Sequence, residues 1–538
     1  MCTNILLDLV IGMLDIAFLG FLLLVINFYT TKNSTKNSFL LQSLSDKNSL
    51  LVICVFFMLF SLKNWLGYRI SKSQNFFFYS VASRLSKRNI AHYLSDDYTK
   101  FVNIDSSIFI RKISQQPVEF SNYILTNVQQ VISQSILIFF TIAGIFFYHP
   151  KSVLSLFLLL LPPVILLAFF IKKKLKNVRA NIKTGSLKAI QYLQEALSGF
   201  VESNIYQKND FFIDRFYHHK QQLDENIAIQ QTLQILPARL IEVFAVFGFF
   251  ILVVINKLSA NAPEIDLLTI GIFMAASYKI IPGVIKILNC SGQIKTYQFS
   301  LNDLSLTVNK APVAGATLPV RQIRSLRFEQ VHFKYHDHTV LNGISFQIAP
   351  GDFAGISAAS GKGKTTIINL LLGFLAPDYG DIFLNNKKTD NSGRQQFWNR
   401  ISYVKQQAFF IHDSILKNII LSDDNYKRDK LEEVLSFCGI DKLLDKYPEG
   451  LEKIIKENGK NISGGQRQRI MLARALYHDF DLLILDEPFG EMDDFSEKVI
   501  LAGLQELAQK GKMILFITHN KSSLSFCNKI FSLDGEYA

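Results

Sequence analysis

Long runs of apolar residues fill the N-terminal half of the chain, whereas apolar and polar positions alternate in the C-terminal half. Because a helix rises 1.5 Å per residue, about 20 mostly apolar residues cross the hydrocarbon core of a membrane. One stretch, VLSLFLLLLPPVILLAFFI, is apolar on every face, which favours lipid over the alternative, the interior of a large soluble helical bundle. Six stretches have or approach the required length: Leu6–Tyr29, Leu50–Tyr68, Val131–Tyr148, Val153–Ile171, Leu240–Ile255 and Leu267–Leu288.

The spacing of these stretches predicts how they cross the membrane. The third and fourth are joined by a few residues around Pro150, as in a tight hairpin. The second and third, and the fourth and fifth, are separated by long spacers of helical composition. Long spacers and short loops therefore fall on opposite sides of the membrane. We expect an all-α six-helix transmembrane domain with long cytosolic extensions.

Charge and cysteine content narrow the class of protein. The chain carries a formal net charge of +12, and its basic residues cluster beside apolar stretches, as in Lys172–Lys176. This placement favours attraction to the anionic headgroups of a lipid bilayer over binding of nucleic acid. The five cysteines are scattered without a C-x-x-C pair, so neither a disulfide framework nor a structural zinc site is expected.

The C-terminal half has the pattern of a separate α/β domain. APVAGATLP, which ends at Pro319, is typical of a linker, and alternating strand-like segments follow it. We predict a transmembrane domain at residues 1–300, a linker at 301–322 and an α/β P-loop domain with a helical subdomain at 323–538.

A glycine-rich turn in this domain predicts a phosphate-binding loop. SAASGKGKTT follows the strand candidate DFAGIS and precedes the helical segment IINLLLGFL. In such a loop, backbone N–H groups and the helix dipole hold phosphates, a lysine reaches them and a hydroxyl holds Mg²⁺. Ala358 stands where the first glycine of G-x-x-x-x-G-K-[ST] belongs, which is tolerable if its φ stays negative. The cradle comprises Ser360, Gly361, Lys362, Gly363, Lys364, Thr365 and Thr366, with Lys364 on the phosphates and Thr365 on the metal.

Three further segments complete the predicted site. FDLLILDEPF delivers two carboxylates to the end of a buried strand, Asp486 for Mg²⁺ and Glu487 for polarising the attacking water. NISGGQRQRIMLARAL places paired glycines before a basic amphipathic helix, a second anion-binding N-terminus. MILFITHN sets His519 at the end of an apolar strand, where a lone histidine is otherwise most often structural.

With these motifs in this order, the whole chain resembles the ATP-binding cassette (ABC) transporters in their exporter arrangement. The resemblance implies ATP and Mg²⁺ as cofactors and a translocase that hydrolyses ATP. It implies that Tyr335 stacks on adenine and that Gln406 contacts Mg²⁺ and senses the γ-phosphate. It also assigns Glu457 to a loop that exporters use for cross-talk with membrane helices, and Asp493 to the loop after the catalytic glutamate. The residues that match the family signature are Ser463, Gly464, Gly465 and Gln466, with Ile462 in place of the usual leucine.

In this family the signature of one subunit completes the nucleotide site of the other. The resemblance therefore implies a dimer, formed by a second copy of the chain or by a homologous half-transporter. It places the force-transmitting contacts near Ile104–Ile113 and Asn204–Phe212, segments that are otherwise ordinary solvated helix bends. The expected location is the bacterial inner membrane, with the ATP-binding domain in the cytosol.

Ionisable residues in the apolar stretches are candidates for contact with a cargo, because charge at membrane depth is costly. Asp8 and Asp15 lie on nearly the same face of the first stretch, and Lys279 lies in the sixth, before Pro282. The alternatives are an interfacial Asp8, a snorkelling Lys279 and an Asp15–Lys63 structural pair. Arg239 and Glu242 favour a helix-end pair.

The predicted function is ATP-driven export or flipping of an amphipathic substrate, namely a lipid, a lipid-linked sugar or a peptide. The first stretch and NIDSSIFIRKI are similar to bacterial lipid-linked oligosaccharide flippases. The alternatives are an ATP-gated channel or regulator, a soluble cassette ATPase acting on DNA or ribosomes, and an importer. The apolar stretches disfavour the soluble ATPase, and the fusion of both domains in one chain disfavours the importer.

Overall fold

The computed structural model describes residues 2–30, 51–95, 98, 105–148, 150–258, 267–305, 321–357, 361–424 and 426–533. The chain divides into two compact units. The first comprises Met1–Asp96 and Asn103–Ala314, and the second comprises Asp97–Val102 and Gly315–Ala538. Residues 306–320, which include most of the predicted linker, lie outside the described residues, so the domain boundaries stay a prediction.

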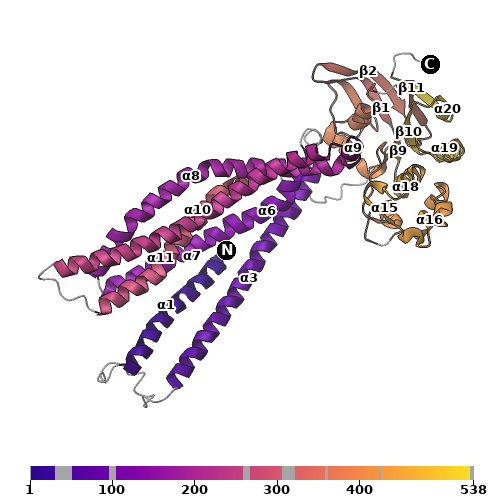
Figure 1. The fold of residues 1–538 in the computed structure, drawn as a ribbon. Coiled ribbons are helices and arrows are strands. Elements are labelled where there is room, and N and C mark those ends of the chain that lie inside the picture. Colours follow the sequence, from indigo (N-terminus) through magenta and orange to yellow (C-terminus); the bar gives the residue numbers. More distant parts are fainter. Residues whose placement is uncertain are drawn as a thin grey trace. The chain divides into compact units, whose positions relative to one another are not determined.

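The described secondary structure of the first unit is helical throughout (Figure 1). Its helices are α1 (Cys2–Thr30), α3 (Leu51–Ser95), α5 (Ser106–Ile110), α6 (Gln116–Glu119), α7 (Thr126–Tyr148), α8 (Pro150–Ser198), α9 (Phe200–Ile205), α10 (Asn209–Leu258), α11 (Leu267–Thr296) and α12 (Gln298–Ser305), with π-helical turns at Arg111–Gln115 and Phe120–Leu125.

Apart from Leu50, which lies outside the described residues, each of the six apolar stretches lies within one long helix, namely α1, α3, α7, α8, α10 or α11. The helices α3, α8 and α10 have 45, 49 and 50 residues, which is about 70 Å of helix and more than twice the thickness of a membrane core. The long spacers are therefore continuous extensions of these helices, as their composition predicted. By length and composition, two described stretches, Ile53–Ser95 and Ser106–Ala143, are apolar enough to cross a membrane.

The acidic residues of α1 have partners on neighbouring helices. α1 packs against α3 and α7. The carboxylate of Asp8 accepts hydrogen bonds from Gln74 (2.7 Å), Gln129 (2.6 Å) and Ser133 (2.9 Å). The ammonium of Lys63 donates to Asp15, so the structure has the Asp15–Lys63 pair that the sequence left as an alternative to a cargo contact.

The other charged residues of the apolar stretches give no evidence for contact with a cargo. Arg239 and Glu242 form the predicted pair, exposed and 3.8 Å apart, but it lies in the interior of α10 and not at a helix end, because the helix continues to Leu258. The side chain of Lys279 lies outside the described residues. The predicted force-transmitting segments lie around α5 and between α9 and α10 of the first unit, and their role stays a prediction.

The second unit is built around a parallel sheet of five strands in the order β11-β3-β10-β9-β6 (Figure 1). These strands are β3 (Phe353–Ser357), β6 (Ile401–Val404), β9 (Leu482–Asp486), β10 (Met513–Thr518) and β11 (Lys529–Ser532). An antiparallel sheet in the order β2-β1-β4-β5 joins β1 (Leu326–Tyr335), β2 (His338–Ile348), β4 (Tyr379–Leu384) and β5 (Lys387–Lys388). A third, two-stranded sheet pairs β7 (Asp413–Ser414) with β8 (Ile454–Ile455).

The central strands of the parallel sheet are buried on both sides, as in other parallel sheets, whose two faces are both covered. Alternate residues of β9 pack into two different apolar clusters, Leu483 and Leu485 into one, Leu482 and Ile484 into the other. The helices of the unit are α13 (Lys364–Leu371), α14 (Asn391–Gln395), α15 (Ile415–Ile420), α16 (Arg428–Phe437), α17 (Asp441–Leu444), α18 (Gly464–Tyr477), α19 (Asp494–Gln509) and α20 (Lys521–Leu524), with 3-10 turns at Trp398–Arg400, Gly450–Glu452 and Glu457–Gly459.

One residue from the N-terminal half also belongs to the second unit. Tyr98 is the described residue of the short segment Asp97–Val102, and its ring stacks on Phe374 with the centroids 4.7 Å apart. This contact was missed in the sequence, where the segment carries no motif.

Candidate nucleotide-binding site

The carboxyl ends of four parallel strands meet at one edge of the five-stranded sheet. Ser357 at the end of β3 pairs with Thr518 of β10, and Ile517 pairs with Asp486 at the end of β9. Val404, the last residue of β6, pairs with Leu485. The predicted site residues that follow these strands are therefore brought to the same edge, where open parallel sheets bind their ligands.

The phosphate-binding loop leaves β3 and enters α13 through two glycines in a left-handed conformation. Gly361 has a φ of +82° and Gly363 a φ of +89°, which glycine adopts at little cost. A Cβ atom on Gly363 would lie 2.8 Å from Leu341 and 2.9 Å from Val340. The loop thus runs close to β2 and turns sharply into α13, which begins at Lys364. Residues 358–360 lie outside the described residues, so the role of Ser360 and the conformation of Ala358 stay predictions.

The two carboxylates after β9 differ in environment. Asp486 is 5% exposed, and both burial and the charge of Glu487 raise the pKa of its carboxyl group. The hydroxyl of Tyr403 donates a hydrogen bond to Asp486 at 3.3 Å, which opposes that shift. Glu487 has a φ of +46°, an uncommon conformation for a residue with a side chain, and its N–H donates to the carbonyl of Ile517.

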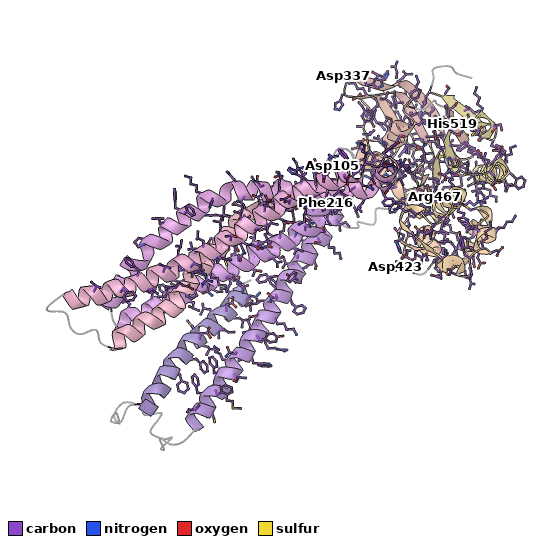
Figure 2. All side chains as sticks on the ribbon, viewed as in Figure 1. Asp105, Phe216, Asp337, Asp423, Arg467 and His519 are labelled. Carbon is purple, nitrogen blue, oxygen red and sulfur yellow. The ribbon has the colours of Figure 1, made fainter. Side chains whose placement is uncertain are left out.

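Glu487 is the centre of the polar cluster at this edge, to which His519 also belongs (labelled in Figure 2). Its carboxylate accepts hydrogen bonds from the ammonium of Lys364 and, at 2.8 Å, from the amide of Gln406. Nδ1 of His519 lies 3.5 Å from the same carboxylate. Burial alone would raise the pKa of Glu487, but the hydrogen bond and charge of Lys364, together with His519, hold it below the usual value. The structure thus brings together four of the predicted residues, which come from four separate segments.

The residues predicted to hold a metal ion suit Mg²⁺. A hydroxyl (Thr365), an amide (Gln406) and a buried carboxylate (Asp486) supply oxygen atoms, which Mg²⁺ prefers, alongside water and substrate phosphates. The described residues contain no cluster of three or more histidine, cysteine or carboxylate ligands, as a closed transition-metal site would require.

Tyr335 lies at the end of β1, in the hairpin that β1 makes with β2. It pairs with His338 across the hairpin, and β2 contributes the two residues that border Gly363. The ring of Tyr335 is 47% exposed and meets Phe333 edge to face at 4.9 Å. A supported ring with an open face suits stacking on a base, and the predicted contact with adenine remains an expectation.

The signature segment forms the N-terminus of α18. The hydroxyl of Ser463 accepts a hydrogen bond from the N–H of Gln466 at 3.4 Å, and the N–H of Ser463 donates to the side chain of Gln466 at 2.9 Å. This reciprocal arrangement is a capping box. The hydroxyl of Tyr447 also donates to Gln466, at 3.3 Å. Gln466 therefore has a structural part in positioning the turn, in addition to the nucleotide contact that the sequence predicted.

Comparison with known proteins identifies this architecture. A sequence profile described as "ABC transporter" matches residues 341–490. A structure of a bacterial Atm1-family ABC exporter with ATP bound matches 99% of this chain and 93% of that chain, with a TM-score of 0.81 and 17% identity. The chain has the fold of an ABC exporter. The predicted fold class, a helical membrane domain followed by an α/β ABC ATPase domain, is confirmed.

The sequence relatives match only part of the chain. A "Putative export ATP-binding/permease protein" of Rickettsia bellii is 34% identical over 242 residues, which are 44% of this chain and 42% of the relative. An "ATP-dependent lipid A-core flippase" of Burkholderia pseudomallei is 31% identical over 230 residues, 42% of this chain and 38% of the relative. The chain thus spans about two fifths of the length of the curated relatives that it matches.

One charged residue beside the predicted signature was missed in the sequence. The carboxylate of Glu491 lies against Gly464, where a Cβ atom would be 1.5 Å from Oε2. Glu491 also pairs with Arg467 at 2.8 Å, and its N–H donates to Gln468 at 3.1 Å. The available signal was its position two residues before Asp493, in the loop that the resemblance places after the catalytic glutamate. Asp493, from the same loop, caps α19 by accepting a hydrogen bond from Ser496 at 2.9 Å.

In the second unit, a polar cavity of about 470 Å³ borders both the predicted signature and the cluster around Glu487. Its lining includes Gln406, Glu487, Gly464, Arg467 and Glu491. Glu491 therefore places a negative charge between two elements that are expected to meet phosphate. The side chain of Glu457, from the predicted cross-talk loop, lies outside the described residues.

Proposed function

We propose that the chain is one half of a dimeric ABC exporter that uses ATP to move an amphipathic substrate across or between the leaflets of a membrane. The observation that carries the proposal is the contact of Lys364, Gln406 and His519 with the single carboxylate of Glu487 at the edge of the parallel sheet. The exporter fold and the long helical extensions of the first unit support it. The partial sequence relatives named as export and flippase proteins are consistent with it.

The chemistry assigned to each residue follows from its position. Lys364, at the start of α13, binds the γ-phosphate, whose charge replaces that of Glu487 as its partner. Glu487 then orients a water molecule and accepts its proton, and His519 holds the carboxylate in place. Asp486, Thr365 and Gln406 would hold Mg²⁺, which neutralises charge on the phosphates.

The low pKa of Glu487 fits this part of the mechanism. A carboxylate that stays ionised at neutral pH is ready to accept a hydrogen bond from water. The raised pKa of Asp486 reflects burial without a full counter-charge, and a divalent cation would supply that charge.

A second copy of the chain, or a homologous half-transporter, would complete each site. Ser463, Gly464 and Gly465 present the N-terminus of α18, which favours an anion. In the proposed dimer this turn meets the γ-phosphate bound to the partner. ATP binding then draws the second units together, and hydrolysis releases them. The segments around α5 and α9 pass this movement to the helices, in a bacterial inner membrane with the ATP-binding unit in the cytosol.

The substitution Glu487→Gln tests the proposal. The variant keeps the size and one acceptor atom of the side chain but cannot take up the proton, so we expect ATP turnover to fall about 10²- to 10⁴-fold while ATP binding persists. Turnover by the full chain in lipid nanodiscs and binding of a fluorescent ATP analogue measure the two effects. Glu506→Gln, an exposed position on α19, is the matched control. Unchanged turnover in Glu487→Gln would refute the role of this carboxylate.

A further inference from the structure

A second cavity lies in the first unit, where α11 packs against both α7 and α10 (Figure 1). Its volume is about 490 Å³, within the range of sites for small molecules and lipid headgroups. Five amide side chains line it: Asn127, Gln130, Gln234, Asn289 and Gln293. Such a concentration of amides is unusual in helices whose remaining contacts are mostly apolar.

The amides form a partial hydrogen-bond network. Asn127 donates to Gln293 at 2.7 Å, and Gln293 donates to Gln234 at 3.1 Å. The thiol of Cys290 donates to Gln130 at 3.3 Å. Asn127 also donates to the backbone carbonyl of Tyr123 at 2.8 Å, so both of its donor hydrogens are used. The side-chain amides of Gln130, Gln234 and Asn289 donate no hydrogen bond within the described residues.

Amides also join helices within membranes without binding anything. Amides that serve only this purpose satisfy one another in close contact, which leaves no space of this size between them. Here the network is open on the side of the cavity. The unused donors and acceptors are therefore available to a polar ligand.

The cavity also carries one cation without a counter-ion. Lys286 and Glu242 both line it, but Glu242 faces Arg239 on its own helix. Lys286 forms no ion pair with a carboxylate in the part of the chain that the structure describes. The lining thus offers a positive charge on the exposed residue Lys286 together with hydrogen-bonding amides, a combination that suits an anionic headgroup.

Apolar side chains adjoin the polar lining. Ile285 lines the cavity and also packs against the buried cluster of Ile241, Ile280 and Ile281. A ligand whose polar end occupied the amides would therefore meet apolar surface next to them. This arrangement fits a molecule with both characters better than a fully water-soluble one.

We propose that this cavity binds the anionic, hydrogen-bonding headgroup of an amphipathic molecule, with Lys286 facing the charge and the amides facing hydroxyl or amide groups. This cavity, rather than Asp8 or Asp15, is the cargo site of the first unit, because both aspartates already have partners. The description of the molecule as cargo rests on the proposed export function, whereas its binding does not.

Equilibrium binding without nucleotide tests the proposal on the full chain in phosphatidylcholine nanodiscs. Two anionic probes represent the two sources of this chemistry, an alkyl phosphosugar and an N-acyl tripeptide with a free carboxylate. The neutral methyl esters of both are the reference ligands. Lys286→Gln removes the charge, Asn289→Asp introduces a repelling one without a change of size, and Lys295→Gln neutralises an exposed lysine of α11 outside the cavity.

We expect at least one anionic probe to bind the unmodified chain more tightly than its ester, and the preferred probe identifies the source. Lys286→Gln and Asn289→Asp should each weaken its binding about tenfold, and Lys295→Gln by less than about twofold. Equal binding of acid and ester, equal effects of Lys286→Gln and Lys295→Gln, or no binding of either probe would overturn the proposal. Since no ATP is present, a failure of ATP hydrolysis would not alter these results.

Discussion

Glu491 is expected to weaken the response of the exporter to ATP, because its carboxylate occupies the place that the signature turn offers to phosphate. The side chain lies against Gly464 at the N-terminus of α18 and is paired with Arg467. In the proposed dimer, the γ-phosphate held by the partner must approach the same N-terminus. The carboxylate has to move away first, and its charge opposes the approach. The substitution Glu491→Gln removes the charge and keeps the shape.

The size of the effect follows from the contacts that the carboxylate makes. The pair with Arg467 is partly exposed, at 29% and 56% for the two side chains, so it contributes at most about 1 kcal/mol. A negative charge at a helix N-terminus contributes about 0.3–1 kcal/mol. The substitution removes part of both contributions, which oppose the approach of the phosphate. We therefore expect the free energy of ATP binding to become more favourable by about 1 kcal/mol, which is about fivefold in the affinity of each site for ATP.

The assay is the ATP concentration that half-saturates turnover of the full chain in nanodiscs. We expect this concentration to fall about fivefold in Glu491→Gln, with the maximal rate within about twofold, and the difference to shrink at high salt. Asp494→Asn neutralises a neighbouring carboxylate at the start of α19 and should change neither value. An unchanged or higher half-saturating concentration in Glu491→Gln would refute the reasoning.

Two further predictions concern carboxylates with a protein partner. Burial raises the pKa of Asp486 while the cation is absent, so at limiting Mg²⁺ ATP turnover should fall on acidification at a higher pH than an ordinary aspartate would give, because Mg²⁺ needs the ionised form. Tyr403→Phe removes a hydrogen bond that lowers this pKa and should move the acid limb of the pH profile to still higher pH; a shift to lower pH would contradict the assignment. In the first unit, Asp15→Leu and Lys63→Leu should each lower the thermal unfolding temperature, while the double variant is destabilised by about 1–3 kcal/mol less than their sum. Additive effects would show that the two side chains act independently.

The nucleotide site was largely predictable because its residues are tied to the ends of secondary structure elements. A buried strand that ends in Asp486 and Glu487 can deliver these carboxylates only to the carboxyl edge of the sheet. The glycines before Lys364 need a turn in which φ is positive, and the structure has it. The spacing along the chain therefore carried most of the geometry. The predicted catalytic and nucleotide-binding roles still await the experiments above.

The contacts between elements were not predictable in the same way. The meeting of Glu491 with Gly464 depends on how the loop after β9 lies on α18, which no local pattern records. The amide cavity has a partial signal, since Lys286, Asn289 and Gln293 are three and four residues apart and so share one face of α11. That spacing does not reveal which faces of α7 and α10 lie opposite.

The first unit shows why charge at membrane depth is a poor guide to a cargo site when it is considered alone. Removing the charge of Asp15 from water is unfavourable, but the ion pair with Lys63 offsets this within the protein. The ammonium of Lys63 also lies 4.6 Å from the centroid of the Phe60 ring, a cation–π contact. A ligand would have to displace this partner before it gained anything from the carboxylate. At the cavity, Lys286 has no carboxylate partner and the side chain of Asn289 has no hydrogen-bond partner within the described residues, so a ligand there displaces neither. Unused hydrogen-bonding capacity next to an uncompensated charge is therefore the better criterion, and it selects the cavity among α7, α10 and α11.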